Sequence, residues 1–128
     1  MSDTIPADAI PDGDGIRSVS AAAAPLESWQ PEGVTILRGD PAGRGFTLFE
    51  QQAGPFFGTG VFACDPATTT YELTENEIIY VVEGSVSIAL DEGAAVHLTV
   101  GDLAFLPKGH TSTWTFHSSF KEVWFLVG

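Results

Sequence analysis

Basic residues are scarce in this chain, and acidic residues outnumber them. Its 128 residues include five Lys and Arg against seventeen Asp and Glu, which gives a formal net charge of −12 at pH 7. A charge of this sign repels phosphate backbones and anionic lipid headgroups at long range. We therefore expect no nucleic-acid partner and no membrane partner, and the surplus of acid can also serve solubility alone.

Cysteine is nearly absent as well. Cys64 is the single cysteine, which excludes an internal disulfide and a thiolate metal cluster and fits a reducing compartment. It has no basic neighbour in the sequence, so we expect an inert core thiol. No apolar run is long enough to cross a bilayer, and the first residues carry acid instead of a basic segment, which argues against a signal peptide. These observations favour a cytoplasmic protein.

Large apolar residues are few before residue 29. Residues 1–28 are instead rich in Pro, Gly, Asp and Ala, including the run from Ala21 to Ala24. A segment of this composition has little to bury. We expect residues 1–28 to form a flexible tail, or an arm that packs only on a partner subunit. Residues 29–128 are expected to form one folded domain.

The rest of the chain consists of short apolar runs separated by turn residues such as Gly101-Asp102 and Pro107-Lys108-Gly109. No stretch keeps a helical period, so the pattern predicts an all-β sandwich or barrel. The expected strands are 34–38, 47–51, 60–64, 77–83, 85–90, 95–100, 103–106, 112–117 and 121–127.

Two blocks in the second half of the chain have an informative spacing. Glu77 is followed by six residues and Gly84, and Gly101 is followed by five residues, Pro107, one residue and Gly109. This pair of blocks resembles the two motifs of the cupin superfamily. The segments GVFACDP, TENEIIYVVEGSVSI, GDLAFLPKGHTSTW and KEVWFL look like the domain-of-unknown-function cupins grouped with ureidoglycine aminohydrolase and the ethanolamine-utilisation cupin. The resemblance implies an all-β, single-domain cupin jelly-roll β-barrel with a flexible N-terminal arm.

The resemblance also locates the usual metal site. Metal-binding cupins commonly carry a His-x-His-x3-Glu set in the first motif and a further His after the second. The residues that this chain places there are Tyr71, Leu73, Glu77 and Ser112. Leucine offers no lone pair and serine is a weak ligand, and the changed ligand set of ureidoglycine aminohydrolase is not matched either. We expect no cofactor. A divalent transition metal held by Glu77 with His110 or Glu72 is the alternative.

Glu77 opens the strand EIIYVVEG, which is otherwise apolar on both faces. Strand alternation places Glu77 on one face with Ile79 and Val81, and we expect another sheet or subunit to cover the opposite face. A buried carboxyl needs a hydrogen bond, a counter-charge or a proton. Tyr71 and Ser112 are the expected donors, and Lys121 is a candidate counter-charge.

Glu77 has two interpretations. It can satisfy a buried polar network, which is a structural role. It can instead recognise a ligand or transfer protons, because burial raises the pKa of a carboxyl toward neutrality. In this second interpretation the candidate catalytic residues are Glu77 and Tyr71, and the candidate substrate-binding residues are Phe62, Leu73, Ser112, Trp114 and His110.

Each histidine, and two of the tryptophans, can also have either a structural or a functional role. His110 lies two residues before Ser112 and, in an extended segment, would point to the same side, where it could replace the missing ligand. His97 and His117 are expected to be structural, at the surface or at a turn. Trp114 and Trp124 are expected to fill the core or a subunit contact, although an aromatic ring at a cupin mouth can also stack on a planar ligand.

Three functional hypotheses follow. The leading one is a metal-independent cupin that binds a small metabolite in its barrel through Glu77 and Tyr71. We also expect the protein to be a homodimer, because folds of this kind cover their exposed strand edges. A nitrogen-containing metabolite is one option, and the sequence leaves open whether the chain is an enzyme. The second hypothesis is a metal-dependent cupin enzyme with unusual ligands, related to ureidoglycine aminohydrolase-type hydrolysis. The third is a non-catalytic interaction module whose barrel is filled by aromatic side chains.

Overall fold

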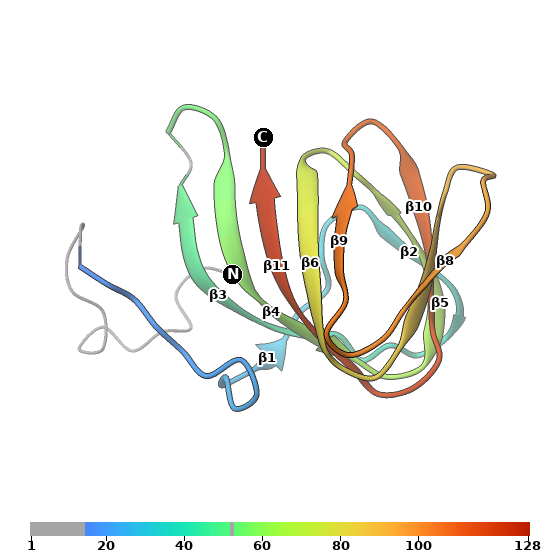
Figure 1. Ribbon diagram of the computed structural model, residues 1–128, viewed down its shortest axis with the longest axis horizontal. Helices are drawn as coiled ribbons and strands as arrows, with labels where there is room; N and C mark the ends of the chain where they lie inside the picture. The colour runs from blue at the N-terminus through green and yellow to red at the C-terminus, as the bar shows by residue number, and fades with distance from the viewer. Residues whose placement is uncertain (1–14, 52) are drawn as a thin grey trace.

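The structure, a computed structural model, describes residues 15–51 and 53–128. Eleven strands and no helix lie in this part of the chain, and they form two antiparallel sheets that face each other (Figure 1). The six-stranded sheet has the order β1 (Glu27–Ser28), β3 (Arg44–Gln51), β4 (Phe57–Cys64), β11 (Phe120–Val127), β6 (Asn76–Glu83) and β9 (Leu103–Leu106). The five-stranded sheet has the order β2 (Val34–Gly39), β5 (Ala67–Glu72), β10 (Thr111–Phe116), β7 (Val86–Leu90) and β8 (Val96–Leu98).

The predicted all-β jelly roll is confirmed, with two separate sheets that do not close into one continuous barrel. Strand β9 has the predicted bounds, and the other predicted strands are present with ends shifted by a few residues. Strand β5 and the short strand β1 were not among the predicted strands. In the described residues no helix is long and apolar enough to cross a membrane.

The core lies between the two sheets and follows the alternation of the strands. The predicted face of β6 is confirmed, because Glu77, Ile79 and Val81 are all buried there. Strands β7, β10 and β11 contribute alternate residues to the same layer. The buried apolar residues of this cluster are Cys64, Leu73, Ile79, Val81, Val86, Ile88, Leu98, Leu106, Trp114, Phe116, Phe120 and Trp124.

The segment before β1 packs on the outer face of the six-stranded sheet. Ala24 is buried against Phe46 and Val61, and Val19 and Leu26 pack beside it. Residues 15–28 of the expected arm therefore contact their own chain, rather than a partner subunit alone, because they cover apolar side chains of β3 and β4. Residues 1–14 lie outside the described residues, and the division between residues 28 and 29 stays a prediction.

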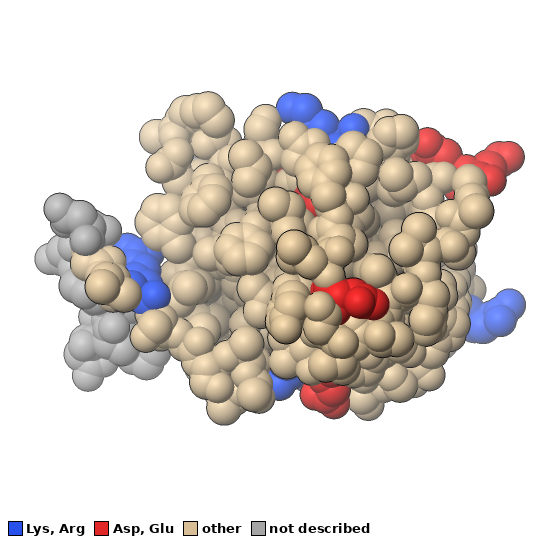
Figure 2. All heavy atoms as spheres, in the orientation of Figure 1, with Lys and Arg blue, Asp and Glu red and all other residues tan. Residues whose placement is uncertain are grey.

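The other half of this outer face is apolar and uncovered. Antiparallel register places Tyr80 of β6 beside Leu103 of β9, and Ile78 beside Phe105. Tyr80, Leu103 and Phe105 are exposed by 44%, 69% and 62%. Figure 2 shows that the face over β11, β6 and β9 carries few charged side chains. The expectation that a second sheet covers this face of β6 is wrong for the described part of the chain.

Candidate functional site

A cavity of about 60 Å³ lies between the two sheets. This is several times the ~10–15 Å³ that one water molecule needs, so the cavity has room for a small ligand. Its lining runs from buried Glu122 to the exposed side chain of Gln30, so the cavity reaches the surface. The remaining lining residues are Trp29, Pro31, Val34, Pro41, Phe62, Thr69, Tyr71, Glu77, Trp114, Phe116, Trp124 and Leu126.

Aromatic rings from both sheets form most of the cavity wall. From the six-stranded side, Trp29 meets the ring of Phe62 edge-on at 6.0 Å between centroids, and it lies 6.1 Å from the ring of Trp124. From the five-stranded side, the ring of Tyr71 is perpendicular to that of Trp114 at 6.5 Å. The negative faces of aromatic rings attract cations, so a wall of this kind suits an apolar or positively charged ligand.

Trp29 reaches this wall because β3 carries glycine where the indole lies. The backbone N–H of Trp29 donates to the carbonyl oxygen of Gly43 at 2.8 Å. A Cβ at Gly45 would overlap the Trp29 ring, and a Cβ at Gly43 would overlap the Trp29 carbonyl oxygen. The close approach of Trp29 to β3 therefore requires both glycines.

Two carboxyl groups face the cavity from neighbouring strands of the six-stranded sheet. Glu77 lies on β6 opposite Leu126, and Glu122 lies on β11 opposite Val81. Their side chains are buried, with residue exposures of 5% for Glu77 and 3% for Glu122. Among the described residues, Oε1 of Glu77 and Oε1 of Glu122 have no hydrogen-bond partner.

Burial changes the protonation of both groups. Desolvation raises the pKa of Glu77 to about 8, and the Glu75 carboxylate adds to the rise. Desolvation also raises the pKa of Glu122 well above its usual range, and the Glu77 carboxylate adds to it. The phenol of Tyr71 has a raised pKa for the same reasons, burial first and then the charge of Glu77. A buried carboxyl without a counter-charge favours its neutral, protonated form.

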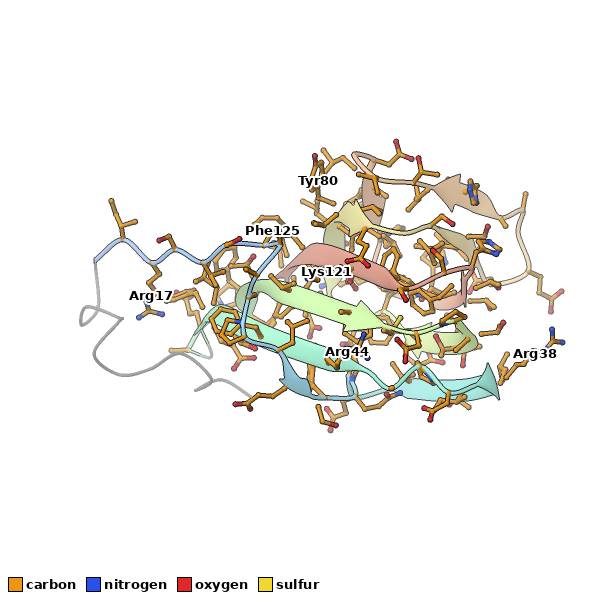
Figure 3. All side chains as sticks on the ribbon, turned by 90° about the horizontal axis from the view of Figure 1, so that it is seen from below. Arg17, Arg38, Arg44, Tyr80, Lys121 and Phe125 are labelled. Carbon is orange, nitrogen blue, oxygen red and sulfur yellow. The ribbon has the colours of Figure 1, made fainter. Side chains whose placement is uncertain are left out.

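No basic side chain lines the cavity, although all five Lys and Arg belong to the described part of the chain. Arg44 pairs with Asp65 at 3.3 Å, and Figure 3 shows Arg17 and Arg38 near opposite ends of the molecule. Lys121 lies opposite Glu83, and its Nζ donates to the carbonyl oxygen of Ala22 at 2.8 Å. The prediction that Lys121 is a counter-charge for Glu77 is therefore wrong, because Lys121 bonds to the N-terminal segment on the outer face of the sheet.

Ser112 does not bond to Glu77 either. Its hydroxyl donates to the carbonyl oxygen of Tyr71 at 2.8 Å and accepts from the Trp114 indole N–H at 2.7 Å. The prediction that Ser112 donates to Glu77 is thus wrong, because the Ser112 hydroxyl links β5 to the Trp114 indole. Tyr71 lines the cavity beside Glu77, but among the described residues no hydrogen bond joins its hydroxyl to that carboxyl.

The same residues do not fit a metal ion at the usual cupin site. Leu73 is buried in the apolar core, and the Ser112 hydroxyl is engaged in two hydrogen bonds. Within residues 15–51 and 53–128, no group of three or more His, Cys, Asp or Glu is arranged to hold a metal. The remaining carboxyl and phenol groups include neither the imidazole nor the thiolate ligands that Zn, Fe, Ni and Cu favour.

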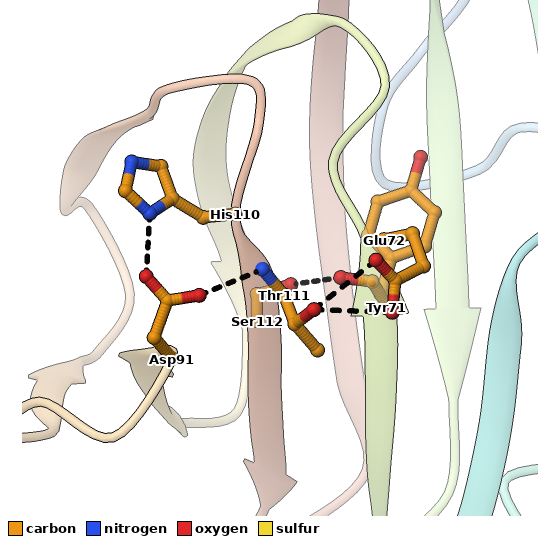
Figure 4. Close-up of polar contacts among 6 residues, drawn as sticks. All are labelled: Tyr71, Glu72, Asp91, His110, Thr111 and Ser112. Carbon is orange, nitrogen blue, oxygen red and sulfur yellow. Dashed lines mark hydrogen bonds and ion pairs between the residues drawn. The ribbon is translucent and has the colours of Figure 1, made fainter.

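His110 lies away from the cavity. Its Nδ1 is 2.6 Å from Oδ2 of Asp91, and the Thr111 N–H donates to Oδ1 of the same carboxylate at 3.1 Å. These bonds hold the pKa of Asp91 below its usual value, with the His110 hydrogen bond as the largest cause. Figure 4 shows the His110 ring and the Tyr71 ring on opposite sides of β10. The prediction that His110 could replace a ligand beside Glu77 is wrong.

The other two histidines lie outside the cavity as well. His97 and His117 both bond to the hydroxyl of Ser87, at 3.1 and 2.8 Å. Both are exposed, and the pair agrees with the expected surface and turn positions.

The structure thus unites part of the predicted site. Glu77, Tyr71, Phe62 and Trp114 line one cavity, whereas Leu73, Ser112 and His110 do not. Sequence reasoning missed Glu122, Trp29 and Phe116. Glu122 had a usable signal, because it alternates with Phe120 and Trp124 in an apolar strand, which is the same argument that singled out Glu77.

Two facing antiparallel sheets with a cavity between them are the architecture of a jelly roll, the fold to which cupins belong. The EutQ-like cupin domain family matches residues 51–124, which is more than half of the chain, so the chain belongs to this family.

Individual relatives agree with this assignment. Acetate kinase EutQ of Clostridioides difficile (strain 630) is 36% identical over 62 residues, which cover 48% of this chain and 39% of that protein. The chain thus spans well under half the length of that relative. Among solved structures, the EutQ protein of Clostridium difficile has a TM-score of 0.58 at 23% identity, over 66% of this chain and 67% of that chain.

Two further solved structures are similar. A putative ethanolamine utilization protein q from Salmonella typhimurium LT2 has a TM-score of 0.59 at 25% identity, over 66% of this chain and 68% of that chain. A DUF861-family protein of unknown function from Pseudomonas syringae pv. tomato str. DC3000 has a TM-score of 0.71 at 22% identity, over 84% of this chain and 46% of that chain. These likenesses agree on the fold.

Proposed function

We propose that the cavity between the two sheets binds a small nitrogen-containing metabolite, and that Glu77 recognises it. The observation that carries this proposal is Oε1 of Glu77, which is buried at the cavity without a hydrogen-bond partner among the described residues. A buried carboxyl that lacks a partner is destabilising, and an N–H group of a ligand would satisfy it. Tyr71 lies on the facing sheet and supplies both an aromatic wall and a hydroxyl.

The cavity suits a ligand of only a few non-hydrogen atoms. Its walls are mostly aromatic and apolar, and its polar groups are few, which is the usual composition of small-molecule sites. With a pKa of about 8, Glu77 can hold or accept a proton near neutral pH. We therefore include weak acid-base catalysis on the bound metabolite in the proposal. We also propose a cytoplasmic location, with which the single cysteine, the buried Cys64, is compatible.

The names of the relatives point to two different chemistries. One relative is named for ethanolamine utilization, and ethanolamine is a small nitrogen-containing compound. Another is named acetate kinase. Phosphoryl transfer needs cationic groups or a metal around the phosphates, and the lining of this cavity contains two carboxyls and no Lys or Arg. The cavity therefore favours a nitrogen compound over a phosphate.

The two alternative functions find less support. A metalloenzyme with unusual ligands would need His110 or Glu72 near Glu77. His110 pairs with Asp91 away from the cavity, and Glu72 is exposed, accepts from the Thr111 hydroxyl and does not line the cavity. An interaction module with a filled barrel would have no internal cavity, and a cavity of about 60 Å³ is present.

The test is a ligand-binding screen by saturation-transfer NMR with small amines, amides and ureas. We expect at least one compound to bind the wild-type protein and to lose most of its signal with Glu77→Gln. Glu83→Gln is the matched control, because Glu83 lies on the same strand but is exposed. Equal binding to wild type and Glu77→Gln, or no binding of any compound, would remove the proposal.

A further inference from the structure

We propose, on the basis of that function, that the ligand is a small aliphatic ammonium ion, which enters the cavity in exchange for a proton of Glu77 or Glu122. The starting point is the arrangement of the two carboxyls. They lie on neighbouring strands, and the inward-facing pair of Trp124 and Ile79 separates them. Each has a buried Oε1 without a hydrogen-bond partner in the described structure, and no described Lys or Arg lines the cavity to serve as a counter-charge.

The wall around these acids is built to accept a positive charge. Trp29, Phe62, Tyr71, Trp114 and Trp124 present aromatic rings to the same space. An ammonium group gains from ring faces and from a carboxylate together, and cages of aromatic side chains are a recurring solution for such ligands. A neutral ligand of the same size would gain the apolar contact and hydrogen bonds, but it would lack the charge attraction.

No described Lys or Arg side chain would compete with a cationic ligand for the cavity. Every Lys and Arg of the sequence is described in the structure, and each lies outside the cavity lining. The titratable groups around the pair are Tyr71 from β5, Glu75 from the turn before β6 and Cys64 from β4. All three are neutral or negative. The charge of Arg44 also reaches Cys64, but Arg44 pairs with Asp65 and lies outside the cavity lining. Among the described residues that line the cavity none is basic, so a cation from outside would be the only positive charge in the lining.

Charge balance then predicts a proton exchange. In the free protein a protonated carboxyl is the neutral form that burial favours. When an ammonium ion enters, its charge stabilises the carboxylate, and the carboxyl proton passes to the solvent. The cavity gains one positive charge and loses one, so its net charge stays the same. Binding should therefore release about one proton and tighten as the pH rises, by up to tenfold per pH unit below the carboxyl pKa.

The experiment compares tetramethylammonium with tert-butanol, two ligands of the same shape that differ in charge. Isothermal titration calorimetry of the full chain, at pH 6, 7 and 8 and in buffers of different ionisation enthalpy, measures affinity and proton release together. We expect tetramethylammonium to bind at least tenfold more tightly than tert-butanol, with about one proton released at pH 7. Tetramethylammonium carries no N–H group, so the released proton must come from the protein.

Variants assign the proton. Of Glu77→Gln and Glu122→Gln, the variant that removes the source of the proton should abolish the release, and Glu83→Gln on the exposed end of β6 should not change it. Equal binding of both ligands, cation binding without proton release, or no binding of the cation would overturn the inference. These outcomes can be distinguished from failure of the proposed function. A neutral amide that binds the wild type but not Glu77→Gln would support the proposed function and contradict only the inference that the ligand is a cation.

Discussion

Glu77 and Glu122 lie on adjacent strands β6 and β11, and both direct a carboxyl into one aromatic-walled cavity, where the buried Oε1 of each has no hydrogen-bond partner among residues 15–51 and 53–128. Each carboxyl opposes ionisation of the other, because like charges in a low-dielectric site repel. This relationship predicts that the stability of the protein depends on pH, and it supports the proposed preference of the cavity for a positive ligand.

The stability of the protein should fall as the pH rises from about 5 to 8. The folded-state pKa of Glu77, about 8, is above the ordinary glutamate value of about 4.3, so the folded state binds more protons than the unfolded state in this range. One such group lowers the free energy of unfolding by about 1.4 kcal/mol per pH unit. Urea denaturation of Glu77→Gln at pH 5.5, 6.5 and 7.5 should show a shallower decline than wild type. A decline unchanged by Glu77→Gln, or reduced equally by Glu83→Gln, would contradict this prediction.

Gly45→Ala should displace Trp29 from the cavity wall. The added Cβ would overlap the indole ring, and overpacking of this kind destabilises by about 1–3 kcal/mol. Tryptophan emission should shift as well, because Trp29 leaves the rings of Phe62 and Trp124. A double-mutant cycle supplies the control: in a Trp29→Ala background, Gly45→Ala should lose most of its effect. The same cost in both backgrounds would show that Trp29 is not what the glycine accommodates.

The apolar outer face over β6, β9 and β11 predicts a homodimer. Tyr80, Leu103 and Phe105 expose apolar surface on neighbouring strands, and a patch on one face can pair with itself about a two-fold axis. Light scattering after gel filtration should give twice the chain mass, and Phe105→Glu should give the monomer. Val96→Glu is the control, because Val96 is exposed on the other sheet. A monomeric wild type would exclude this dimer.

The purified protein should contain transition metal only near background. Leu73 and the fully bonded Ser112 occupy two of the positions where related proteins carry ligands, and Glu77 faces no histidine in the described structure. Elemental analysis after growth in metal-supplemented medium tests this directly. Thermal unfolding with added Mn, Zn, Ni or Fe should show no stabilisation. Near-stoichiometric metal that disappears in Glu77→Gln would mean that a ligand set of another kind exists.

The sequence predicted what periodicity and spacing control. The alternation of EIIYVVEG correctly buried Glu77 with Ile79 and Val81, and the two spaced blocks led to the correct family. Strand β5 was missed because Thr68, Thr69 and Thr70 form a polar run without apolar alternation, although threonine favours strands.

The site was only partly predictable, because its remaining members depend on long-range packing. Trp29 reaches the cavity from the segment before β2 only because Gly43 and Gly45 leave room beside β3. Local sequence gives no sign of that approach. Leu73 was placed in the site by analogy with a ligand position, and His110 was placed there by alternation with Ser112. In the structure Leu73 packs in the core and His110 bonds to Asp91.

The measurement that tests the account most directly is an NMR titration of the glutamate side-chain carboxyl carbons, with Glu77→Gln and Glu122→Gln used for assignment. The account predicts that Glu77 titrates near pH 8 and that Glu122 also titrates well above the ordinary range. It further predicts that both pKa values fall when tetramethylammonium is added. Two carboxyls that titrate between pH 4 and 5, with or without the cation, would contradict the account.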